Sequence, residues 1–166
     1  VTKTVPALDK NGQPTVLRVN SKTVNITLPN QAITVYYRTD SSGTSEQFGK
    51  FLQGANAVKN PGVWPKTASG TFANSTPRNI ANSFNFQGAS GSALVAAGVK
   101  GKVGGIGYGE VSWATDNKLP VASIKNAAGE FVAPSAAGTS AFLGGGTIQA
   151  NGGLVADYVK AITGAY

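Results

Sequence analysis

One short segment constrains the fold more than any other part of the chain. Residues 32–37 read Ala-Ile-Thr-Val-Tyr-Tyr, a β-branched and aromatic run typical of a buried strand. A polar stretch comes next at residues 38–44, and Phe48, Phe51 and Leu52 then recur at helical spacing. Hydroxyl residues stand where that helix would begin and are N-cap candidates. The segment therefore predicts a strand, a tight polar loop and a helix N-terminus.

Later segments continue the alternation of strands and helices. The small residues of 91–99 favour a helix, the Gly-rich run 103–108 favours a buried strand, and residues 119–125 favour another strand. Pro134 indicates that a helix or turn begins after it. This alternation predicts an α/β layered domain. A closing helix is expected near the end of the chain, with an apolar face made of Leu154, Val155, Tyr158, Val159 and Ile162.

Two further stretches are less regular. Residues 1–27 carry an Asn-Gly turn signal and a period-two alternation, which predict a β-hairpin or an extended arm. Residues 54–87 are rich in Pro, Asn, Ser and Thr, so we expect a long surface excursion. Its aromatic residues, among them Trp64 and Phe72, are too many for a free linker.

Composition removes most enzyme classes. The 166 residues suffice for one domain and include no His, Cys or Met. That excludes Ser-His-Asp and Cys-His catalysis, zinc fingers, disulfides and iron–sulfur clusters. No general base or metal cluster is visible in the sequence, so we expect a protein that is not an enzyme and needs no cofactor or metal.

Charge and hydropathy limit the kinds of partner that the chain is expected to bind. Fourteen Lys and Arg against seven Asp and Glu give a net charge of +7, which favours anionic partners. The basic residues are scattered rather than clustered, so nucleic acid is not an expected partner. No apolar run of about 18 residues is present, so we expect no membrane span. The first residue is Val1 rather than Met, which indicates a processed chain or an excised piece.

The polar loop at residues 38–44 gathers groups that bind an oxyanion. Gly43 and Thr44 would offer backbone N–H groups at a helix N-terminus. Ser42 and Thr44 add hydroxyl donors, and Arg38 supplies charge and a fork of N–H donors. Asp40 would accept a bond from Arg38 and orient it. The alternative is an ordinary Asx or Ser/Thr turn that caps a helix.

This loop carries a resemblance to a known family. Residues 36–45 read Tyr-Tyr-Arg-Thr-Asp-Ser-Ser-Gly-Thr-Ser and resemble the Arg-x-Asp-x-Ser-Gly-Thr signature of the phosphate-binding proteins that serve high-affinity phosphate ABC importers. Residues 104–114 are similar to the family's Gly-x-Ile-Gly-Tyr strand and the segment after that strand. The resemblance covers about residues 28–135 well and 136–166 weakly, and it does not extend to 1–27.

The resemblance implies one lobe of a type II periplasmic-binding-protein fold at residues 28–166, with a mixed central sheet flanked by helices and residues 1–27 as the hairpin or arm. It implies phosphate contacts from Arg38, Ser42, Gly43 and Thr44, with Asp40 orienting Arg38. Ser90 and Ser92 would lie near the site or cap a helix. The family's second lobe is not recognisable in this chain, so we expect weak, millimolar-scale phosphate binding.

The family's role implies a receptor for inorganic phosphate that works with a membrane ABC permease. It also implies export to the periplasm or cell surface, and leaves open a lipid anchor on a full-length form. The alternative reading is a cell-envelope structural or adhesion module of the same fold that binds an acidic polymer or a protein through its basic, Asn/Ser/Thr-rich surface.

Other signals favour structural roles. The Gly-rich stretch 98–109 fits neither the dinucleotide fingerprint nor a Walker A loop, and tight strand–helix packing explains it better. Trp64 and Trp113 are expected in a core or an interface. The remaining acidic residues show no metal-loop spacing and are interpreted as surface groups; they are Glu110, Asp116, Glu130 and Asp157.

Overall fold

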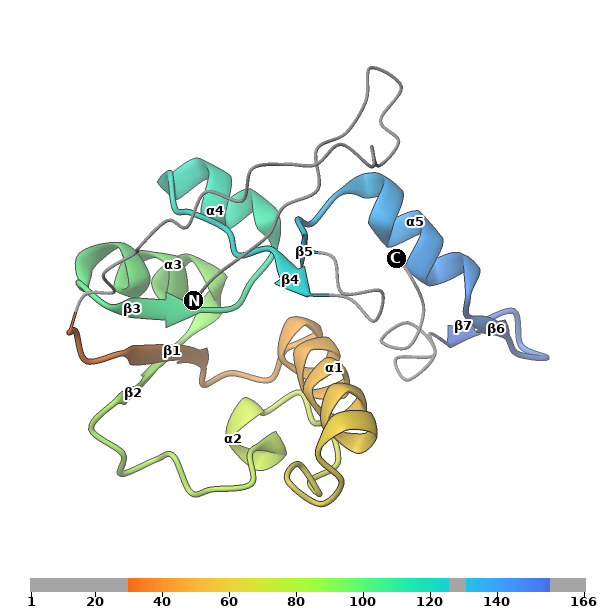
Figure 1. Cartoon of the computed structure of the whole chain (residues 1–166), viewed down its shortest axis with the longest axis horizontal. Coiled ribbons are helices and arrows are strands. Elements are labelled where there is room, and N and C mark those ends of the chain that lie inside the picture. Colours follow the sequence, from red (N-terminus) through yellow and green to blue (C-terminus); the bar gives the residue numbers. More distant parts are fainter. Residues whose placement is uncertain (1–29, 126–130, 156–166) are drawn as a thin grey trace, which may run out of the picture. The chain divides into compact units, whose positions relative to one another are not determined.

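The structure is a computed structural model that describes residues 30–125 and 131–155 (Figure 1). The chain divides into two compact units, Val1–Gln31 and Ala32–Tyr166, and every described helix and strand lies in the second. The hairpin or arm expected at residues 1–27 lies outside the described residues and stays a prediction. No helix in the described ranges is long and apolar enough to cross a membrane.

A parallel three-stranded sheet organises the second unit. Its strands are β1 (Thr34–Arg38), β2 (Phe86–Ala89) and β3 (Gly105–Gly107), in the order β2-β1-β3. Both pairings of β1 are parallel. Parallel neighbours need crossover connections, and these carry the helices α1 (Gly43–Lys59), α2 (Phe72–Ser75) and α3 (Gly91–Gly101). The predicted α/β layered domain is thus confirmed.

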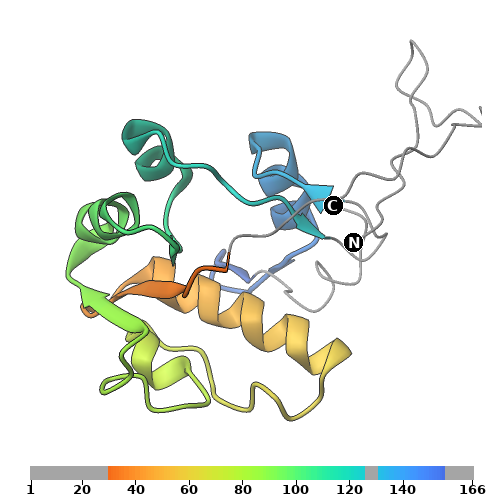
Figure 2. The ribbon, with the colours of Figure 1, turned by 60° about the vertical axis from the view of Figure 1, so that its left-hand side comes forward.

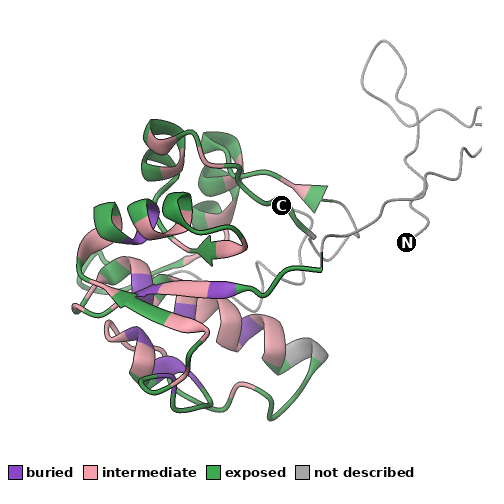
Figure 3. Cartoon of the chain, turned by 90° about the vertical axis from the view of Figure 1, so that its left-hand side faces the viewer, coloured by how far each residue is buried: buried purple, intermediate pink, exposed green. Residues whose placement is uncertain are grey.

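Consecutive residues of β1 face opposite layers, because side chains alternate along a strand. Tyr37 packs in a core cluster with Phe72 and Ile80, on the side of α1 and α2. Tyr36 meets α3 on the other side, against Gly98. Figure 2 shows α1 and α3 on opposite sides of β1, and Figure 3 shows buried residues where β1, α1 and α2 meet.

The Gly-rich stretch allows α3 to approach the sheet closely. A Cβ at Gly98 would lie 2.4 Å from the ring of Tyr36, and a Cβ at Gly105 would lie 2.9 Å from the carbonyl oxygens of Val99 and Lys102. Neither position tolerates a side chain without movement of its neighbours. Tight strand–helix packing thus explains Gly98 and Gly105, as predicted, whereas a Cβ at Gly101 or Gly109 would meet no atom within 4 Å.

The prediction of a long surface excursion at residues 54–87 is partly wrong. Helix α1 continues to Lys59, and the stretch also contains α2 and the beginning of β2. Its aromatic content was correctly taken as a sign of packing, because Phe72 is 4% exposed. Phe84, in contrast, is 90% exposed.

The remaining elements are short. They are α4 (Val111–Asn117), β4 (Ile124–Lys125), β5 (Phe131–Val132), α5 (Ala136–Gly144), β6 (Thr147–Ile148) and β7 (Leu154–Val155). The strand predicted at residues 119–125 is confined to β4. The helix or turn expected after Pro134 is confirmed as α5, whose N-cap Ser135 accepts a bond from the amide of Gly138.

The prediction of a closing helix is wrong at the first two residues of its apolar face. Leu154 and Val155 form β7, which pairs antiparallel with β6. Gly152 lies in the intervening turn with φ +79°, and the side chain of Asn151 accepts a hydrogen bond from the amide of Gly153. The turn brings Leu154 opposite Ile148, and this pairing overrides the helical spacing of the apolar residues. The rest of the predicted helix lies outside the described residues.

Candidate functional site

The carboxyl ends of the three parallel strands meet at one edge of the sheet. Arg38 ends β1, Ala89 ends β2, and Gly107 ends β3. The loops after these strands lead into the N-termini of α1, α3 and α4 (Figure 1). Ligand sites of open parallel sheets lie at this edge, outside the carboxyl ends of the strands.

Arg38 and Asp40 form an ion pair at this edge. Arg38 Nε donates to Asp40 Oδ1 at 2.8 Å, and a second bond joins Nη2 to Oδ2. Asp40 Oδ1 also accepts a bond from the amide of Gly91 at 2.8 Å, so the carboxylate caps α3 as well. These bonds, first that from Arg38 and then that from Gly91, hold the pKa of Asp40 well below its ordinary value. The bond to Asp40 likewise raises the pKa of Arg38.

Ser42 begins α1 as its N-cap. Its Oγ accepts bonds from the amides of Thr44 at 3.1 Å and Ser45 at 3.4 Å, which satisfies two N–H groups of the first turn. The hydroxyl hydrogen of Ser42 is not used in these bonds. The Ser42 side chain takes no bond from the amide of Gly43, which is exposed and has open space where a Cβ would stand.

Glu110 joins the hydroxyl groups of two helices. Thr44 Oγ1 donates to Glu110 Oε1 at 2.6 Å, and Ser92 Oγ donates to Oε2 at 2.8 Å. Ser92 Oγ in turn accepts a bond from Arg38 Nη1 at 2.9 Å. The pKa of Glu110 is lowered, chiefly by the bond from Thr44. Glu110 is exposed, as expected for a surface group, and it also bridges α1 and α3.

Tyr108 connects this edge to the core. Its hydroxyl lies 2.6 Å from Ser45 Oγ and accepts a bond from the amide of Arg38 at 3.3 Å. Its ring stacks on Phe48 with centroids 4.6 Å apart. Burial raises the pKa of Tyr108. The tyrosine thus fixes both the end of β1 and the first turn of α1.

The structure brings most of the candidate residues together. Arg38, Asp40 and Ser92 form one bonded network, and Ser42 and Thr44 lie beside it at the start of α1. Ser90 is exposed and is the N-cap residue of α3, but its side chain makes no capping bond; Asp40 caps this helix from the neighbouring loop instead.

Sequence reasoning missed Glu110 and Tyr108. The available signal was their position, directly after the end of a Gly-rich strand, since the ends of parallel strands share one edge. Among the residues that the structure describes, no group of His, Cys, Asp and Glu could hold a metal ion.

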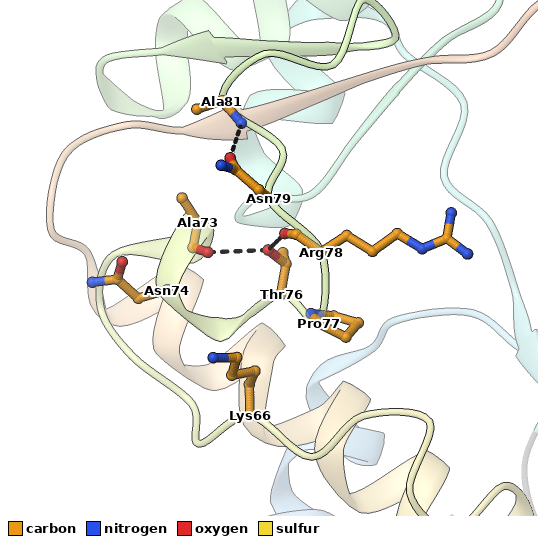
Figure 4. A pocket seen from close by; sticks show the side chains of 8 residues that line it. All are labelled: Lys66, Ala73, Asn74, Thr76, Pro77, Arg78, Asn79 and Ala81. Atoms are coloured by element: carbon orange, nitrogen blue, oxygen red, sulfur yellow. Dashed lines mark hydrogen bonds between the residues drawn. The ribbon is translucent and has the colours of Figure 1, made fainter.

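A separate hollow lies near α2. It has a volume of about 620 Å³ and includes Lys66, Thr76 and Arg78 in its lining (Figure 4). None of its lining residues belongs to the loop at 38–44, and the guanidinium of Arg78 extends away from the others. We take the strand edge as the candidate site, because there a restrained arginine, a helix N-terminus and converging hydroxyls occur together.

These features define an α/β domain with a candidate oxyanion site at the carboxyl edge of a parallel sheet. No family model matches the chain. The chain is 37% identical over 116 residues to the phosphate-binding protein PstS 2 of Mycobacterium tuberculosis. The aligned residues make up 70% of this chain and 27% of that protein. It is 32% identical over 129 residues to the phosphate-binding protein PstS of Pasteurella multocida. Here the aligned residues make up 78% of this chain and 33% of that protein.

A third relative is the phosphate-binding protein PstS of Xylella fastidiosa, 31% identical over 109 residues, with 66% of this chain and 27% of that protein covered. The chain therefore spans between a quarter and a third of the length of these relatives. It is a distant and partial homologue of the PstS-like phosphate-binding proteins, which are binding proteins rather than enzymes. Its parallel sheet flanked by helices agrees with one lobe of that fold.

The Asp40 contacts predict a pH dependence of stability. A carboxylate whose pKa is lowered on folding stabilises the protein above its unfolded pKa, about 3.9, and this contribution is lost as the pH falls toward the folded pKa. We expect the melting temperature of the wild-type chain to fall more steeply than that of Asp40→Asn from about pH 5 to about pH 2. Thermal melts followed by circular dichroism measure this difference. Asp116→Asn, at an exposed carboxylate of α4, should behave like wild type; parallel curves for wild type and Asp40→Asn would contradict the prediction.

Proposed function

We propose that this chain binds inorganic phosphate at the carboxyl edge of the sheet, as part of a receptor for phosphate import. One observation carries the proposal: Arg38, 13% exposed in its side chain, is held by Asp40 beside the N-terminus of α1. A restrained guanidinium costs less entropy to order when it binds an anion. The similarity of the chain to phosphate-binding proteins supports the choice of phosphate.

The donors on this edge suit a tetrahedral anion. A guanidinium has five N–H groups; Arg38 uses three, for two bonds to Asp40 and one to Ser92, which leaves two for a ligand. Gly43 adds an amide and Ser42 a hydroxyl. The first turn of α1 adds the partial positive charge of a helix N-terminus. Recognition then consists of replacing the water around phosphate with fixed donors.

The proposed role is non-catalytic. The remaining phosphate contacts would come from a second lobe of the receptor, and lobe closure would signal occupancy to a membrane ABC permease. Such a receptor is exported to the periplasm or the cell surface; a lipid anchor on a full-length form belongs to the same proposal. Nucleic acid has no part in it.

Phosphate titration of the chain, followed by backbone amide NMR, tests the proposal. We expect saturable shifts at Gly43, Thr44 and Ser92, with millimolar-scale affinity, because Gly43 is exposed and water competes for its amide. Sodium chloride at matched ionic strength is the control for non-specific charge effects. Absence of saturable shifts at these amides would contradict the proposal, and sub-micromolar affinity would contradict its weak-binding part.

The hollow near α2 favours one alternative, a cell-envelope module that binds an acidic polymer. Lys66 and Arg78 line it, and no acidic residue does. The same spectra distinguish the two functions when a polyanion such as polyglutamate is added. Salt-sensitive shifts around Lys66 and Arg78, without phosphate shifts at Gly43, would favour the alternative.

A further inference from the structure

An acidic side chain of the protein itself occupies part of the proposed phosphate site. Both carboxylate oxygens of Glu110 accept hydrogen bonds, from Thr44 Oγ1 at 2.6 Å and from Ser92 Oγ at 2.8 Å. A hydroxyl has one hydrogen to donate. Neither hydroxyl can therefore donate to phosphate while it donates to Glu110.

Charge adds to this competition. Ser92 Oγ also accepts a bond from Arg38 Nη1, so the carboxylate is one hydroxyl away from the guanidinium that would bind phosphate. Thr44, Ser92 and Arg38 keep Glu110 ionised, since each lowers its pKa. A phosphate anion that approached Arg38 would meet this negative charge at close range.

Resting on the proposed function, we infer that Glu110 is an internal competitor that restricts phosphate binding, and that phosphate displaces it from Thr44 and Ser92. The carboxylate satisfies the two hydroxyls when the site is empty. When phosphate arrives, both hydroxyls turn to the ligand, and Glu110 moves into solvent. In this scheme Glu110 competes for the two hydroxyls and is not a phosphate ligand.

The N-terminus of α4 is built so that it can follow this movement. Glu110 is the N-cap residue of α4, and its carbonyl oxygen accepts a bond from the amide of Trp113 at 3.1 Å. Helix α4 has seven residues, none of them buried, so few apolar contacts resist a small shift. Release of Glu110 would therefore change the surroundings of Trp113, whose side chain is 38% exposed.

Glu110→Gln tests the competition, because glutamine keeps the size of the side chain and removes its charge. We expect it to bind phosphate roughly three- to tenfold more tightly than the wild-type chain, measured by the Gly43 and Thr44 amide shifts. Glu110→Ala, which removes both hydrogen bonds, should also bind more tightly. Asp116→Asn is the matched control: it removes the same charge from an exposed site on α4 and should bind like wild type.

Trp113 fluorescence tests the displacement. In a Trp64→Phe background Trp113 is the remaining tryptophan, and phosphate should change its emission in the chain with Glu110 but much less in Glu110→Gln. Saturable amide shifts with equal or weaker binding in both Glu110 variants would overturn this inference and leave the phosphate proposal standing. If neither the wild-type chain nor any variant shows saturable amide shifts with phosphate, the proposed function is wrong, and the inference about Glu110 is wrong with it.

Discussion

Arg38→Ala is expected to abolish detectable phosphate binding by this chain. The substitution removes the formal charge and the two guanidinium donors that remain for a ligand, and charge-assisted hydrogen bonds contribute about 1.5–3 kcal/mol each. The loss of even one such bond weakens binding by about tenfold to a hundredfold, and the loss of both moves a millimolar affinity beyond measurement. Amide NMR or isothermal titration with inorganic phosphate measures the effect.

The chain offers a closely matched control for this substitution. Arg78→Ala lowers the net charge of +7 by the same one unit, but at an exposed site near α2. It should bind phosphate like wild type. Arg38→Lys keeps the charge and loses the planar fork, so we expect binding between those of Arg38→Ala and wild type. If Arg38→Ala is folded, as checked by circular dichroism, and binds phosphate with wild-type affinity, then Arg38 does not belong to the phosphate site.

The sequence was most informative where local chemistry decides the structure. The run from residue 32 to residue 37 and the polar loop after it predicted a strand and a helix start, and the structure has β1 and an α1 capped by Ser42. Those features depend on neighbours within a few residues. The glycines of 98–109 were also interpretable, because no nucleotide motif fits them and close packing requires small residues.

Long-range contacts escaped the sequence interpretation. Strand β2 exists because residues 86–89 pair with β1, some 50 positions away in the chain, and its own sequence, Phe-Gln-Gly-Ala, has weak strand propensity. Glu110 reaches Thr44 in the same way, through the folding of β3 beside β1. The short pair β6–β7 depends on the turn at Gly152 rather than on apolar periodicity, which explains why a helix was expected at Leu154.

Phe72→Ala is expected to give the largest loss of stability of any substitution proposed for this chain, about 3–5 kcal/mol. Phe72 is 4% exposed, and its ring lies between those of Tyr37 at 5.9 Å, Phe48 at 6.0 Å and Tyr108 at 5.0 Å. Truncation would leave a cavity between three aromatic rings that come from β1, α1 and the loop after β3, so no single segment can move to fill it. Urea unfolding followed by circular dichroism measures the change as a lower midpoint.

Phe84→Ala is the matched control, because the same side chain is removed where it is 90% exposed; its free energy of unfolding should change by less than about 0.5 kcal/mol. The loss in Phe72→Ala should extend to the site, since Tyr108 both packs on Phe72 and holds Ser45 and the amide of Arg38. We therefore expect faster hydrogen exchange at the amide of Arg38 in Phe72→Ala than in Phe84→Ala. Equal unfolding midpoints for the two variants would show that this aromatic cluster does not stabilise the sheet edge.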